Sequence, residues 1–137
     1  MDFGYIKLPK GVEMREPYEG ERRYFEKNPN VSGMATEDGK VILNPYSKLS
    51  EREYQSVATN EAVRLAIKQD RSLVPDFELT EQQKRFLDTT TYRYADEEDR
   101  KATIAARLVS GDPSAGVSTT EQDAFVNMLK AKLFGEE

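Results

Sequence analysis

Apolar and polar residues alternate at helical spacing over much of the chain from residue 50 onward, most clearly over residues 50–70. At the start of this stretch, Ser50 and Glu53 match a capping box, in which the hydroxyl and the carboxylate each accept a hydrogen bond from a backbone amide. Apolar residues then recur every three or four positions, which places them on one face of a helix. These residues are Tyr54, Val57, Ala58, Ala62 and Leu65.

Three further helices are predicted after this one. The second helix begins at Thr80, which matches a capping box with Gln83. The third covers about residues 96–110, and its acidic first turn suits the positive end of a helix dipole. The last helix opens at Ser118, which we expect to be boxed with Glu121.

The first third of the chain has a different pattern. Glycines and prolines interrupt residues 1–20, which predicts an extended arm and not a helix. Residues 21–27 could form a short helix. Residues 31–43 are typical of a β-hairpin, because Asp38-Gly39 supplies the positive φ angles of a tight turn between two short apolar runs.

These elements predict a mainly α fold with one small β-hairpin. We expect an orthogonal helical domain over residues 21–137, which contains the hairpin at about 31–43, preceded by the extended N-terminal arm of residues 1–20. A chain of 137 residues fits one domain. Only 37% of the residues are hydrophobic and 33% are charged, so we expect an elongated shape or a surface that a partner completes.

The apolar residues of the arm are difficult to explain as a solvated tail. Phe3, Tyr5 and Leu8 lie among glycines and prolines that exclude a helix. The arm either packs on its own domain or docks on a neighbouring subunit. Under the second alternative, these three residues are candidates for binding a partner.

The composition excludes several kinds of chemistry. The chain has no Cys and no His, so cysteine nucleophiles, histidine acid–base catalysis and structural zinc sites are ruled out. The net charge of −5 argues against direct nucleic-acid binding. No apolar run approaches the length of a membrane span. We therefore assign no catalytic, cofactor-binding or metal-binding residue, identify no small-molecule substrate, and expect a protein without enzyme activity.

Glu61 interrupts the apolar face of the helix over residues 50–70. With Tyr54 taken as zero, Leu65 lies at about +20° around the helix axis and Glu61 at about −20°. A buried carboxylate is costly unless it is paired, so we expect Glu61 to be partly buried and bound to Arg64, to backbone amides or to an arginine such as Arg107. A catalytic role as a general base is the alternative to this structural role.

Residues 60–64, Asn-Glu-Ala-Val-Arg, resemble the H-E-x-x-H helix of zincin metallopeptidases at one position, Glu61. Asn60 and Arg64 occupy the two positions that hold the metal ligands in that family, and Arg64 would repel a cation. What the resemblance implies is, at most, a remnant of a peptidase-like fold without catalysis.

A second resemblance covers about residues 24–130. The stretches NPNVSGMATEDGKVILNPYS (28–47), NEAVRLAI (60–67) and TIAARLVSGDPSAGVSTTEQ (103–122) are similar to small uncharacterised proteins of tailed bacteriophages. Those proteins have the same order of hairpin, NEA-type helix, IAAR-type helix and GDPSA loop. The resemblance implies a phage origin and assigns no catalytic residue.

A phage origin leads to two functional expectations. The first is a structural protein of the virion, such as a decoration, connector or tail-associated protein, assembled in the host cytoplasm and binding other virion proteins or itself in an oligomeric assembly. The alternative is an accessory protein that binds and inhibits a host protein. An acidic surface would suit a host target that normally binds nucleic acid.

Overall fold

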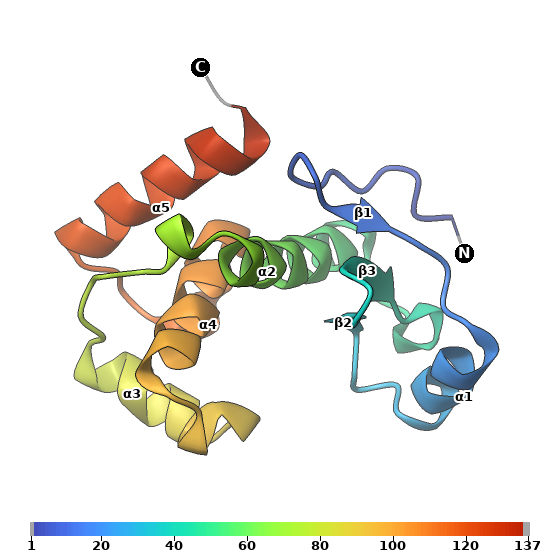
Figure 1. Cartoon of the computed structure of the whole chain (residues 1–137). Helices are drawn as coiled ribbons and strands as arrows, with labels where there is room; N and C mark the ends of the chain where they lie inside the picture. Colours follow the sequence, from blue (N-terminus) through green and yellow to red (C-terminus); the bar gives the residue numbers. More distant parts are fainter. Residues whose placement is uncertain (1, 136–137) are drawn as a thin grey trace.

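The computed structural model describes residues 2–135, so the last two residues of the predicted 21–137 domain lie outside the described part. Helix α2 (Glu51–Gln69) crosses the middle of the molecule, with two packed units beside it (Figure 1). The N-terminal lobe (residues 2–49) contains the arm, α1 and the sheet. The C-terminal lobe (residues 71–135) contains α3, α4 and α5. The prediction of a mainly helical fold with a small β element is confirmed.

The helices begin where side chains can cap them. Ser50 and Glu53 form the predicted capping box at the start of α2, and Thr80 with Gln83 forms the box at the start of α3. Asp96 caps α4, whose last turn ends at Gly111 in the left-handed conformation. The bounds of the other helices are Glu19–Lys27 for α1, Glu81–Asp88 for α3, Glu97–Ser110 for α4 and Thr120–Phe134 for α5.

The predicted start of α5 is wrong by one residue. The helix is capped by Thr119, whose hydroxyl accepts from the amide of Gln122 at 3.1 Å. The hydroxyl of Ser118 instead donates to Asp123. Both pairs of residues match the box in sequence, but Gln122 is fully buried whereas Glu121 is exposed, so burial decides between them.

Three short strands form the sheet, in the order β1-β3-β2. Strands β2 (Gly33–Ala35) and β3 (Lys40–Leu43) form the predicted antiparallel hairpin, and Gly39 at its turn has a φ of 79°. The third strand, β1 (Glu13–Met14), comes from the arm and pairs in parallel with β3. The sequence pattern does not reveal β1, because two residues are too few to show an alternation.

The arm packs on its own domain, which is the first of the two alternatives. The ring of Phe3 lies edge-on to Tyr54 with centroids 4.9 Å apart, and Tyr5 and Leu8 pack against the same apolar cluster. The amide of Lys10 donates to the carbonyl of Leu133 at 3.2 Å, so the arm also reaches α5. Helix α1 begins at Glu19, so its first two residues overlap the end of the predicted arm of residues 1–20.

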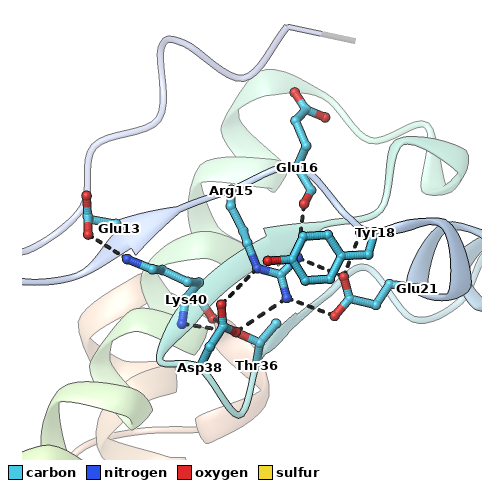
Figure 2. Close-up of polar contacts among 8 residues, drawn as sticks. All are labelled: Glu13, Arg15, Glu16, Tyr18, Glu21, Thr36, Asp38 and Lys40. Atoms are coloured by element: carbon cyan, nitrogen blue, oxygen red, sulfur yellow. Dashed lines mark hydrogen bonds and ion pairs between the residues drawn. The ribbon is translucent and has the colours of Figure 1, made fainter.

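Arg15 fastens the arm to the hairpin turn and to α1 (Figure 2). Its guanidinium donates two hydrogen bonds to Asp38 (3.2 and 3.3 Å), two to Glu21 (2.8 and 2.9 Å) and one to the carbonyl of Glu16 (3.0 Å). All five N–H groups of the side chain are therefore used. The ring of Tyr18 covers the guanidinium at 3.8 Å. The Arg15 hydrogen bonds hold the pKa of Glu21 below its usual value.

Two buried glutamines join α3 to α5. Gln83 and Gln122 are both fully buried and exchange two amide hydrogen bonds of 2.9 Å. Each carbonyl oxygen also accepts from the amide of its own helix cap, Thr80 or Thr119. The second N–H of Gln122 donates to the carbonyl of Glu78. The two capping boxes thus form one connected polar network inside the C-terminal lobe.

Within residues 2–135, no helix combines the length and the apolar character that crossing a bilayer requires.

The glutamine pair gives a stability prediction. Gln122→Glu keeps the size of the side chain but removes the N–H donors and places a carboxylate in a buried site. We expect it to lower the free energy of unfolding by about 3 kcal/mol at neutral pH. Gln82→Glu, one residue before Gln83 and exposed, is the matched control. Equal urea midpoints for the two variants would contradict the buried pair.

The Arg15 network gives a second prediction. Arg15→Lys keeps the positive charge but cannot form two bidentate pairs, so it should lower the melting temperature almost as much as Arg15→Ala. Arg23→Ala removes an exposed pair with Glu19 on α1 and should have little effect. The measurement is thermal unfolding of the three variants. A lysine variant as stable as the parent would show that charge alone suffices.

Candidate functional site

Two adjoining hollows form a groove between β2 on one side and α2 on the other. The larger has a volume of about 410 Å³ and the smaller about 180 Å³, and both are lined by Gly33 and Glu61. We call them together the inter-lobe groove. The larger hollow also contains Arg64, Lys68 and Tyr92, and the smaller contains Asn60, Arg107 and Asp112.

Gly33 lets the strand lie close to the helix. A Cβ atom at this position would be 2.9 Å from Cγ1 of Val57 and 3.0 Å from the carbonyl oxygen of Ile42. Neither neighbour can yield easily, since one is packed and the other is backbone. The absence of a side chain at Gly33 therefore sets the width of the groove.

The outer edge of β2 faces the groove. The carbonyl of Ser32 accepts from Asn44, and the amide of Thr36 donates to Lys40, so these residues bond to β3. In an antiparallel ladder such residues alternate with residues whose backbone groups point the other way. The backbone N–H and C=O groups of Gly33 and Ala35 consequently point away from β3.

Glu61 lies in the floor of the groove. Its side chain is 17% exposed, and Oε1 is 3.4 Å from Nη1 of Arg64. Burial raises the pKa of Glu61 above its ordinary value, while Arg64, the backbone amide of Ala35 and Arg107 favour the charged form. The structure thus brings together Glu61 and Arg64, the pair expected from the sequence. Their contact is long, so the attraction offsets only part of the desolvation cost of the buried carboxylate.

The two arginines of the groove are held by different contacts. The guanidinium of Arg64 lies 4.7 Å from the ring of Tyr92. Arg107 pairs with Asp112 and also donates to Ser114 at 3.1 Å. Its buried Nε makes no hydrogen bond with any residue of the described part of the chain. Each arginine therefore has a carboxylate partner, and these two pairs carry no net formal charge.

The residues proposed for partner binding from the sequence lie elsewhere. Phe3, Tyr5 and Leu8 pack with the N-terminal lobe and do not line the inter-lobe groove. The edge of β2 was not identified from the sequence, because the direction of its backbone groups depends on which strand lies beside it. The glycine at position 33 was the one available signal of a close approach.

The groove is lined by side chains that can form hydrogen bonds. Asn60 and Arg64, at the positions of the zincin ligands, both line it. Among residues 2–135, no group of three carboxylate-bearing residues is arranged to hold a metal ion. Glu61 has Arg64 and the backbone amide of Ala35 as partners. The groove can accept or donate hydrogen bonds through β2, Asn60 and Glu61.

Comparison with known proteins adds no further constraint: no protein-family model, no curated protein and no solved structure matches this chain.

The buried carboxylate gives a pH prediction. Because the pKa of Glu61 is raised on folding, the folded state holds this proton at a pH at which the unfolded state has released it. Glu61 therefore costs stability at neutral pH, and this cost disappears as the pH falls towards the unfolded pKa. Relative to Glu61→Gln, the parent should gain stability between pH 7 and about pH 4.5. Urea unfolding at several pH values measures this difference.

Glu97→Gln, on the exposed first turn of α4, controls for the loss of one carboxylate. A parent that loses stability relative to Glu61→Gln on acidification would mean that Glu61 is ionised in a well-compensated site.

Proposed function

We propose that the chain is a non-enzymatic structural protein of a bacteriophage particle that binds other virion proteins. The sequence resemblance supports the phage origin. The binding role is supported by one observation above all, a hollow of about 440 Å³ beside α1. We call it the α1 hollow. Its lining residues are Phe3, Glu16, Pro17, Arg22, Leu43, Pro45 and Tyr46.

The composition of the α1 hollow suits a protein partner. Rigid aromatic and proline side chains offer contact area that loses little entropy when a partner binds, and tyrosine and arginine are enriched among the residues that dominate binding energies. Arg22 and Tyr46 also line a second depression over α1, with Glu19, Arg23 and Glu26. The α1 hollow is thus lined by both apolar residues, such as the buried Leu43, and charged ones, such as the exposed Arg22, a combination that also occurs in protein interfaces.

The arm contributes to this surface by shaping it. Phe3 is fixed against Tyr54 and at the same time lines the α1 hollow. Two tyrosines at α1 are also on the surface: Tyr18, which precedes the helix, is 63% exposed, and Tyr24, within it, is 46% exposed. The chain has few apolar residues, and yet it exposes these two aromatic rings. This favours the interpretation that a partner covers this surface.

The alternative function is that of a phage accessory protein that binds and inhibits a host protein. The net charge of −5 favours a target that normally binds nucleic acid. Both functions need a protein-binding surface, and the location of the chain separates them.

Two measurements test the proposal. Mass spectrometry of purified particles should find the chain in many copies. If the chain is absent from particles and is instead recovered bound to a host protein from infected cells, the accessory role is favoured.

The second measurement uses a charge reversal. Arg22→Glu places a repulsive charge beside the α1 hollow and should reduce incorporation into particles about tenfold or more. Arg85→Glu, an exposed charge reversal on α3, should leave incorporation unchanged. Equal incorporation of both variants would exclude the α1 hollow as the binding surface.

A further inference from the structure

We propose that the inter-lobe groove binds an extended segment of a partner protein, which adds to the edge of β2 and places an amide side chain, Asn or Gln, in the smaller hollow. This deepens the proposed binding function and names the chemistry of one partner. The groove shares no lining residue with the α1 hollow, so the two surfaces can be tested independently.

The main-chain part of the interaction follows from the edge of β2. Gly33 and Ala35 point their backbone groups away from β3 and into the groove. An extended segment that pairs with such an edge gains main-chain hydrogen bonds whatever its sequence. The amide of Ala35 already faces Glu61, so the N–H and C=O of Gly33 and the C=O of Ala35 are the groups left for a partner.

The side-chain part follows from the polar groups of the smaller hollow. The side chain of Asn60 lines it and makes no hydrogen bond with any of residues 2–135. Arg107 forms part of the same wall, and Glu61 offers carboxylate oxygens beside Asn60. Donors and an acceptor therefore lie together in a space of about 180 Å³, large enough for one side-chain amide.

The charge balance of the smaller hollow selects a neutral side chain. The two carboxylates that line it already have a cation, because Glu61 is paired with Arg64 and Asp112 with Arg107. An additional carboxylate or ammonium group would be desolvated without a partner of its own. An amide can accept from Asn60 and donate to Glu61 without introducing a charge, which an apolar side chain of the same size cannot do.

The test uses three synthetic peptides of alternating Thr and Val with a central Gln, Glu or Leu, added to the full chain labelled with ¹⁵N. The Gln peptide should shift the amide resonances of Gly33 and Ala35 at concentrations of about 1 mM, the weak end of specific affinities. The Glu and Leu peptides should bind about tenfold or more weakly, because each leaves buried polar groups unpaired. No shift with the Gln peptide, or equal shifts with all three, would overturn the proposal.

Two variants locate the site. Asn60→Leu should weaken binding of the Gln peptide about tenfold or more, while Asn127→Leu, exposed on α5, should not. Unchanged binding to Asn60→Leu would overturn the assignment.

Discussion

Helix α2 is enclosed by both lobes, and this enclosure fixes the arrangement of the other elements. Tyr54, Ala58 and Ala62 pack with the arm and the sheet, while Val63 and Ile67 pack with the helices of the C-terminal lobe. Each lobe therefore lacks a complete core without α2. Because two sides of the helix are committed, a narrow polar strip remains uncovered, and this strip is the wall of the inter-lobe groove.

Buried polar side chains supplement the small apolar content of the chain. Asn44 is fully buried, and its side-chain amide nitrogen donates to the backbone carbonyls of Phe25, Asn28 and Val31. The backbone carbonyl of Asn44 accepts from the hydroxyl of Tyr54. It thus links α1, the hairpin and α2. The pair of buried glutamines has the same character in the C-terminal lobe, and the partly exposed Arg15 network plays a similar part in the N-terminal lobe. Each replaces missing apolar contact with a hydrogen-bonded polar network, which specifies one arrangement of the elements.

The proposed function uses two surfaces that arise from the same architecture. The α1 hollow exists because the arm folds back and places Phe3 beside the hairpin and α1. The inter-lobe groove exists because β2 is an edge strand that approaches α2 at Gly33. The proposed role in an assembly that joins partners requires two separate surfaces of this kind. At the edge of β2, the backbone amide of Ala35 faces Glu61.

The helices, the hairpin and the position of Glu61 can be predicted from the amino-acid order alone, because capping, turn chemistry and helical spacing are local properties. The same holds for the pair of Glu61 and Arg64, since residues three apart on a helix are neighbours. The docking of the arm, the third strand and the start of α5 follow instead from contacts between segments that are far apart in the chain. Those features depend on which side chains are buried by distant segments, as the contact of Gln122 with Gln83 illustrates. The inter-lobe groove belongs to the same class, because a strand edge acquires a direction only when its neighbours are placed.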